Sequence, residues 1–251
     1  MSLVVGALFW PRGAGAALSR ALAEAYADAA ADLRAAAESG AGTGAVAGGA
    51  GADLAVRSAA AARRLDDAFR EFLAERGPKR LGLAEVTALL TGVAGLRLTA
   101  DAVRDLWSQD RRGPHPVRAP RTTSELIAGT ERVTNWYAAL AQAAAGSGTV
   151  PRALPPDGSA DGRLVEALRQ DLADTSAPGT SAPGTSAPDG VLRGDVVRLV
   201  WTADHVDAAR RLQAAVEAPA RTVASRPRTA RPEGLPEQRR PVPDGAERST
   251  R

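Results

Sequence analysis

Cysteine is absent from this chain of 251 residues, and histidine occurs only twice, at His115 and His205. The lack of cysteine excludes a disulfide framework, a cysteine-ligated zinc site, an iron–sulfur cluster and thiol catalysis. His205 lies between Asp204 and Asp207, and His115 lies between two prolines, so neither has further ligands at a useful spacing. We therefore expect no metal site, no cofactor and no histidine-based catalysis.

Several other residue types are nearly missing. Aromatic residues make up 4% of the chain, and Lys79, Ile127 and Asn135 are the only representatives of their types. Lys, Ile and Asn have AT-rich codons, so a GC-rich genome is the simplest cause, and the arginine excess is weak evidence for an anionic ligand. Alanine, in contrast, supplies roughly a fifth of the residues, well above ordinary usage. Because Ala, Leu, Arg and Glu dominate and strand formers other than Val are scarce, the composition predicts an all-α fold.

The charge balance does not indicate a nucleic-acid-binding protein. The formal net charge is +3, from 32 basic and 29 acidic residues. A nucleic-acid interface requires a clustered basic face, so we expect no nucleic-acid partner. The basic surplus lies partly in the last thirty residues, where arginines alternate with prolines. We interpret this stretch as a solvated tail, with contact to anionic lipid headgroups or to nucleic acid as the alternatives.

Apolar residues recur at three- and four-residue steps in six segments, which predicts an antiparallel helical bundle with Pro/Gly-rich linkers and a disordered C-terminal tail. The expected helices cover about residues 14–38, 53–76, 83–109, 123–145, 162–173 and 191–218. The expected organisation is an apolar segment at 1–13, a helical bundle at 14–145, a short helix with a low-complexity linker at 146–190, an amphipathic helix at 191–218 and a disordered Arg/Pro-rich tail at 219–251.

The helix boundaries are expected at capping and breaking residues. Asp53 is the predicted N-cap of the second helix, and Thr123 or Ser124 that of the fourth. Pro219 is expected to end the last helix, because proline cannot continue the hydrogen-bond ladder. The repeated Thr-Ser-Ala-Pro-Gly sequence predicts disorder over Thr175 to Asp189, and the Arg/Pro-rich composition predicts it again over 221–251.

The helical stripes predict the residues of the core. The apolar stripe of the first helix consists of Leu18, Leu22, Tyr26, Ala29 and Leu33; that of the second includes Val56, that of the third begins at Leu83, and that of the last includes Val200. Gly92 and Gly95 interrupt the third stripe and mark either a kink or a close helix crossing. The alanine-rich stripes bury little area per residue. The few aromatic side chains, Trp201 among them, are therefore expected to fill much of the core volume. The predicted core consists of Leu65, Phe69, Phe72, Leu90, Val103, Trp107, Trp136 and Leu140, with Tyr137 beside Trp136.

No group of residues predicts catalysis. Asp66 and Asp67 are adjacent and would point about 100° apart on a helix, so they share no site. Asp67 and Glu71 share a face, but several arginines stand beside them, which favours a solvated ion-pair face. A phosphate-binding loop, a dinucleotide fingerprint and a nucleophile elbow are all absent from the sequence. We therefore expect this protein not to be an enzyme.

The N-terminal residues Leu3 to Trp10 form an unbroken apolar run that ends at Pro11-Arg12-Gly13. The run is shorter than the roughly 20 residues that a spanning helix needs, and it lacks the basic start and cleavage site of a signal peptide. Two aromatic residues followed by a cation are nevertheless typical of the cytoplasmic end of a membrane helix. We therefore predict membrane-interface contacts at Leu8, Phe9, Trp10 and Arg12. A buried helix or a loose terminus is the alternative.

Three stretches carry a family resemblance: Val5–Gly13, Arg64–Gly77 and Thr87–Asp101. They resemble actinobacterial proteins of the FUSC family, which includes fusaric acid resistance and aromatic acid exporter-like permeases. The resemblance covers about Leu3 to Trp107, and the last helix loosely. It implies the soluble, cytoplasm-facing helical part of a membrane permease, at the cytoplasmic side of the cell membrane. The family transports small molecules such as aromatic acids, but this chain lacks the spanning helices, and no catalytic or substrate residue of the family maps onto it.

Two other functions compete with this interpretation. The first is a stand-alone cytoplasmic scaffold or interaction protein without catalytic activity. The second, a helical DNA-binding regulator, fits poorly because the link between the third and fourth helices is long and rich in proline. The expected partners are a membrane surface, the membrane-embedded part of a FUSC-like protein, or further copies of this chain.

Overall fold

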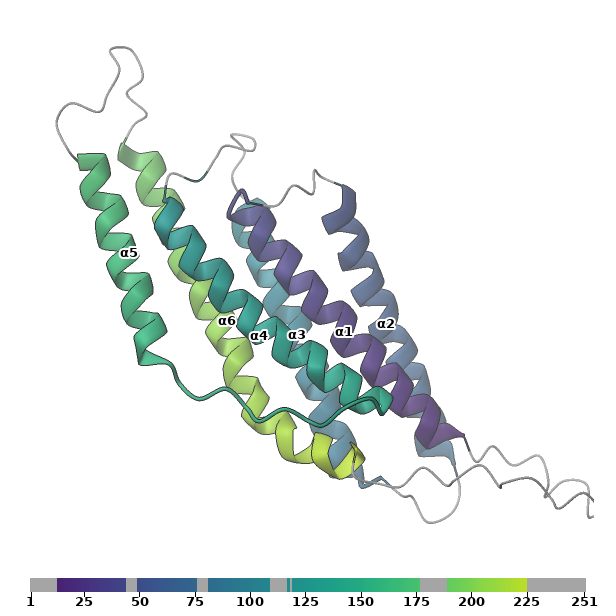
Figure 1. The fold of residues 1–251 in the computed structure, drawn as a ribbon. Coiled ribbons are helices and arrows are strands. Elements are labelled where there is room, and N and C mark those ends of the chain that lie inside the picture. The colour runs from purple at the N-terminus through teal and green to yellow at the C-terminus, as the bar shows by residue number, and fades with distance from the viewer. Residues whose placement is uncertain are drawn as a thin grey trace, which may run out of the picture.

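A computed structural model describes residues 13–43, 49–75, 81–108, 117, 119–176 and 189–224. Successive helices run in alternating directions, and the predicted all-α bundle is confirmed (Figure 1). The described helices are α1 (Ala14–Gly40), α2 (Gly49–Ala74), α3 (Leu83–Ser108), α4 (Pro120–Ala145), α5 (Gly158–Ser176) and α6 (Asp189–Ala224).

Helix α1 is the central element of the bundle. It packs against α2, α3 and α4, while α6 packs against α3 and α4, and α5 lies against α4. Helices α2 and α5 therefore flank the bundle at opposite edges (Figure 1). The stripe predicted for α1 is confirmed, since all of its members are buried: Leu18, Leu22, Tyr26, Ala29 and Leu33. Alanines between the larger side chains allow three neighbouring helices to approach one central helix.

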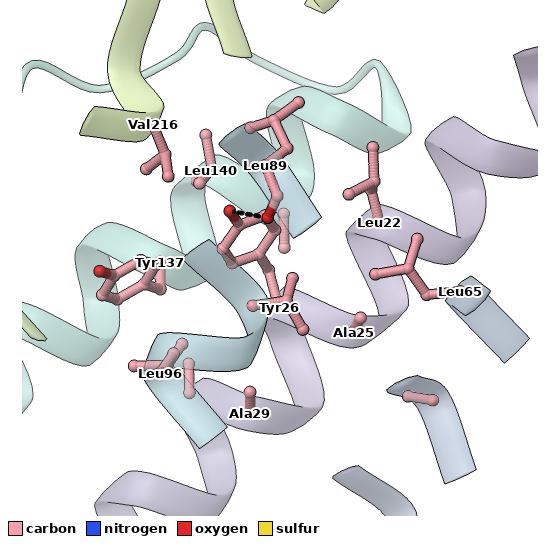
Figure 2. Close-up of a cluster of buried hydrophobic side chains, with 14 of the residues drawn as sticks. Leu22, Ala25, Tyr26, Ala29, Leu65, Leu89, Leu96, Tyr137, Leu140 and Val216 are labelled. Carbon is pink, nitrogen blue, oxygen red and sulfur yellow. Dashed lines mark hydrogen bonds between the residues drawn. The ribbon is translucent and has the colours of Figure 1, made fainter. Parts of the chain in front are cut away.

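Two buried tyrosines connect four helices. The rings of Tyr26 and Tyr137 are stacked, with their centroids 5.8 Å apart (Figure 2). The Tyr26 hydroxyl donates to the carbonyl oxygen of Leu89 at 2.7 Å, which ties α1 to α3. The Tyr137 hydroxyl donates to the carbonyl oxygen of Ala209, also at 2.7 Å, which ties α4 to α6. Desolvation by burial raises the pKa of both phenols.

The two glycines of α3 mark a close helix crossing, which was one of the two predicted alternatives. A Cβ atom at Gly92 would collide with the Tyr26 hydroxyl and with a methyl group of Val216 on α6. A Cβ atom at Gly95 would lie 2.6 Å from Leu212 of the same helix. Glycine at these two positions therefore permits the contact of α3 with α1 and α6.

The predicted core is right for five of its eight residues. Leu65, Phe72, Val103, Trp136 and Leu140 are buried. The other three, Phe69, Leu90 and Trp107, are partly buried against the same core.

The expectation that Trp201 adds bulk to the core is wrong, because its side chain is 53% exposed. It lies with Val197 and Val200 on the outward stripe of α6, although Val200 was expected on the inner stripe. The polar side chains of Thr202 and Gln213 are buried instead. Thr202 accepts a hydrogen bond from the Trp107 indole at 3.1 Å, so burial of this hydroxyl is compensated.

Two further stripe residues are exposed. Val56 at the start of α2 is 66% exposed, and Leu83 at the start of α3 is 54% exposed. Leu89 and Leu96, which were not among the predicted core residues, are buried in α3. Val86, Val93, Ala100 and Val103 of the predicted stripe are buried as well, so the buried face of α3 is wider than that stripe.

The predicted N-caps are wrong. Helix α2 begins at Gly49, so Asp53 lies inside it. Helix α4 begins at Pro120, ahead of Thr123 and Ser124, and proline at the first helical position is favourable because its missing N–H would have no partner in the helix.

A distant carboxylate caps α4 instead. The Asp171 side chain on α5 accepts hydrogen bonds from the backbone N–H and the hydroxyl of Thr122, both at 2.9 Å. This carboxylate also lies at the positive end of the α4 dipole, where negative charge is stabilising. The cap therefore fastens α5 to the start of α4.

Pro219 lies inside α6, so the expected end of the last helix is wrong, and residues 219–224 are helical rather than part of the tail. Proline removes one backbone hydrogen bond. Ala220 is buried and Val223 packs against the core, so tertiary contacts hold the last turn in place. Helix α5 is also longer than predicted and includes residues 175–176, and α6 begins at Asp189, so the disorder expected at these three residues is wrong. The remaining predictions of disorder, for 177–188 and 225–251, lie outside the described residues.

Candidate functional site

A groove of about 270 Å³ lies between α4, α6, the start of α5 and the connecting residues Leu154 to Asp157. Its apolar lining comes from all of these elements: Leu126, Val133, Leu154, Pro155, Pro156, Ala160, Leu164, Ala203 and Val206. We call this hollow the α4–α6 groove. An apolar lining with a few polar groups at the rim is typical of small-molecule sites.

The connecting segment that forms one wall of the groove is tied to α6 by hydrogen bonds. The backbone N–H of Leu154 donates to the Gln213 side-chain oxygen at 3.0 Å, and that of Ala153 donates to Glu217 at 2.7 Å. The Arg210 guanidinium donates a hydrogen bond of 3.2 Å to the carbonyl oxygen of Leu154. These bonds satisfy the backbone of a segment that has no helix of its own, so the wall has a defined position.

The rim of the groove carries more negative than positive charge. Four carboxylates line it, from Glu125, Asp157, Asp161 and Asp207, together with two guanidinium groups, from Arg132 and Arg210. The Asp207 carboxylate is neutralised by Arg210 at 2.6 Å and by Arg211. The formal charge of the lining residues is −2, and it is offset by Arg163 and Arg211, which pair with Glu125 and Asp207 from outside the lining.

The most negative part of the rim is the beginning of α5. The Asp157 carboxylate accepts hydrogen bonds from the Ser159 hydroxyl at 2.6 Å and from the backbone N–H of Ala160 at 3.0 Å. These bonds, led by that of Ser159, lower the pKa of Asp157. Asp161 follows one turn later, and its carboxylate forms no hydrogen bond or ion pair within the part of the chain that the structure describes.

A second hollow, between α1 and α2, is lined by exposed ion pairs. Arg57 contacts Asp28 at 2.8 Å, and Arg64 contacts Glu24 at 3.2 Å. Each charge that lines this hollow therefore has a partner of opposite sign, and such exposed pairs contribute little to stability. These ion pairs join α2 to α1. The hollow is therefore part of the contact between the two helices and carries no candidate site.

The structure describes some of the other residues that the sequence analysis considered as sites. Arg70 and Asp67 form an exposed pair at 2.8 Å on α2, in agreement with a solvated ion-pair face. His205 lies on α6, with its ring 6.4 Å from that of Trp201. Among the described residues, no three His, Asp or Glu side chains are grouped as metal ligands. The predicted membrane-interface residues Leu8, Phe9, Trp10 and Arg12 lie outside the described residues, as does His115.

One described helix, α3, is long and apolar enough to cross a bilayer by length and composition, with a mean hydropathy of 1.3. This helix packs against α1 and α6, and 44% of its apolar window is buried. A core helix of a bundle can pass the same test of length and composition.

Sequence reasoning did not find the groove, because its walls come from three stretches that are far apart in the chain: 125–133, 154–164 and 203–210. One local signal was available. Asp157 stands directly before Gly158-Ser159, and an aspartate at that position is typical of a helix start. Read as an N-cap, Asp157 predicts that α5 begins at Gly158. Asp157 and Asp161 would then lie one helical turn apart.

No family model, curated protein or solved structure matches this chain.

Proposed function

We propose that this chain is the soluble, cytoplasm-facing helical part of a FUSC-like membrane protein, with no catalytic activity of its own. In this proposal Leu8, Phe9 and Trp10 lie at the membrane interface, and Arg12 lies on the cytoplasmic side. The family resemblance supplies the parent function, transport of small molecules such as aromatic acids. The chain itself would not form a transport path, because the one described helix that is long and apolar enough to cross a bilayer, α3, packs against α1 and α6.

The observation that best supports the proposal is the position of α1. This central helix begins at Ala14, directly after Arg12 and Gly13. Three residues, 11–13, would separate a membrane helix that ends at Trp10 from α1, and they can span at most about 10 Å. A membrane segment there would therefore hold the whole bundle against the bilayer through its central helix.

Exposed apolar side chains at the same end of the bundle agree with this orientation. The end of α2 and the start of α3 lie at the end where α1 begins (Figure 1). Leu73, close to the end of α2, is 44% exposed, and Leu83 at the start of α3 is also exposed. Apolar side chains that face a bilayer need no protein partner, because lipid removes them from water.

The proposal is tested by flotation of the full chain with vesicles that contain anionic lipids. We expect the unmodified chain to float and the variant Phe9→Glu/Trp10→Glu to remain in the aqueous fraction. Each aromatic side chain contributes about 1.5–3 kcal/mol when it leaves water, so loss of both lowers binding by at least about tenfold. The control is Val56→Glu, which introduces one of the two added negative charges at an exposed valine near the opposite end of the bundle.

Equal flotation of the double variant and the unmodified chain would contradict the proposal, since the N-terminal run would then not be the anchor. A chain that stays soluble without detergent and does not float would favour the second candidate, a stand-alone helical scaffold. Self-association through the N-terminal run is a further proposal, and the same double variant is expected to abolish it.

A further inference from the structure

We propose that α6 pairs in antiparallel orientation with α6 of a second copy of this chain, through the face that it turns away from its own bundle. This inference assigns an interaction surface and goes beyond the proposed membrane attachment. We call the surface the outer face of α6. It consists of Val197, Val200, Trp201, Asp204, Arg211, Ala214, Ala215 and Ala218, all of which are exposed.

The outer face has no partner helix in its own bundle. Helix α6 packs against α3 and α4 with side chains of its opposite face, such as Leu199, Val206 and Val216, which are buried. On the outer face, three large apolar side chains stand within five residues of one another, at 197, 200 and 201. Apolar side chains that gather on a surface, rather than occurring singly, are typical of a contact with another molecule.

The sizes of the side chains indicate the partner and its direction. The first half of the outer face carries large apolar side chains, and the second half carries exposed alanines. An antiparallel second copy, related by a twofold axis between residues 207 and 208, sets each large side chain over an alanine. The resulting pairs are Val197 with Ala218, Val200 with Ala215 and Trp201 with Ala214 of the second copy. Large side chains that face small ones allow two helices to pack closely.

The charges of the outer face are complementary in this same register. Asp204 and Arg211 lie at equal distances on the two sides of the twofold axis, so Asp204 of each copy faces Arg211 of the other. Within the described part of the chain, the Asp204 carboxylate forms no hydrogen bond or ion pair. The Arg211 side chain contacts Asp207 on its own helix but is still 57% exposed, and its guanidinium has further N–H groups to donate.

A parallel pair of α6 helices fits less well. In that arrangement Asp204 would face Asp204 and Arg211 would face Arg211, so like charges would be opposed at two positions. The large side chains would also face one another, and the alanines would leave a gap. Size and charge, which are independent properties of the sequence, therefore favour the same antiparallel register.

Sedimentation velocity of the full chain tests the proposal. Every chain carries Phe9→Glu/Trp10→Glu, so that association through the N-terminal run does not contribute. The paired segment is about 30 Å long and forms a small interface, so we expect a dimer with a dissociation constant on the order of 10 μM. Trp201→Ala is expected to weaken dimerisation at least about tenfold, because a large aromatic anchor is lost. Leu98→Ala, at an exposed leucine of α3, is expected to leave it unchanged.

Two charge reversals test the register itself. Asp204→Arg opposes two arginines in the homodimer, and Arg211→Asp opposes two aspartates, so each variant alone is expected to dimerise at least about tenfold more weakly. An equimolar mixture of the two variants is expected to dimerise at a concentration where each alone is monomeric. In that mixed dimer the introduced arginine faces the introduced aspartate, and the native Asp204 faces the native Arg211.

The matched controls are Glu166→Arg and Arg169→Asp, which reverse an exposed pair on α5 outside the outer face and are expected to leave dimerisation unchanged. Thermal unfolding of each variant shows that it is folded before association is compared. The proposal is wrong if the chain is monomeric at about 100 μM, if either reversal at Asp204 or Arg211 leaves dimerisation unchanged, or if the mixture stays monomeric. These measurements use no lipid, so the membrane proposal stands or fails separately.

Discussion

Replacing Phe72 with alanine is expected to lower the free energy of unfolding by about 3–5 kcal/mol. The Phe72 side chain is 2% exposed and belongs to the main core cluster, where α2 packs on α1. Removal of the ring loses the free energy gained when the ring leaves water. It also leaves a cavity, and an alanine-rich interface has few large side chains that could fill it. Urea denaturation followed by circular dichroism measures the loss.

Two variants on the same helix serve as controls. Phe69 is only partly buried, so Phe69→Ala is expected to cost about 1–2 kcal/mol. Val56 is largely exposed, and Val56→Ala is expected to change stability by no more than about 0.5 kcal/mol. A loss at Phe69 that equals the loss at Phe72 would show that the inner face of α2 is assigned incorrectly.

Raising the pH well above 10 is expected to unfold the bundle before either tyrosine ionises. The chain has two tyrosines, Tyr26 and Tyr137, and both are buried and donate hydrogen bonds to helix carbonyls. Burial raises the pKa of both in the folded state, whereas in the unfolded chain they titrate near about 10. The native state therefore retains protons that the unfolded state releases. The stabilisation is complete below pH 10 and falls as the pH rises above it.

The ultraviolet absorbance of tyrosinate, followed together with circular dichroism, measures this effect. We expect no tyrosinate signal while the helical signal is intact, and a simultaneous change in both at high pH. In urea, both tyrosines are expected to titrate near about 10. If half or all of the tyrosinate signal developed near that pH with the helices intact, at least one of the two rings would not be buried in the core.

The sequence predicts the fold class and the central helix well, for a physical reason. On α1, large apolar residues recur at helical spacing, and neighbours on three sides bury the whole stripe. On α6, apolar residues occur on two faces, so periodicity alone did not show which face is inside. The sequence therefore predicts Trp201 in the core, whereas the buried face carries Thr202 and Gln213. These two polar side chains accept hydrogen bonds from the Trp107 indole and from the backbone N–H of Leu154.

The helix ends and the groove depend on contacts between distant segments. The cap of α4 is Asp171, which lies about fifty residues further along the chain, so no local motif at Thr123 reveals it. Pro219 is kept in α6 by the packing of the residues that follow it. The groove needs α4, α6 and the start of α5 to be assembled before its charges share one rim. Local sequence patterns predict helices, but they do not predict which polar residues meet.

Fractionation of cells that naturally produce the protein tests the proposed membrane attachment most directly. An antibody raised against the helical bundle, applied to the separated fractions, reports where the polypeptide resides. Attachment through an apolar segment predicts that it is found in the membrane pellet, resists a high-salt wash and is released by detergent, because salt screens charges but does not weaken apolar burial in lipid. Recovery of the polypeptide in the soluble cytoplasmic fraction, or its release from membranes by salt alone, would contradict the proposal.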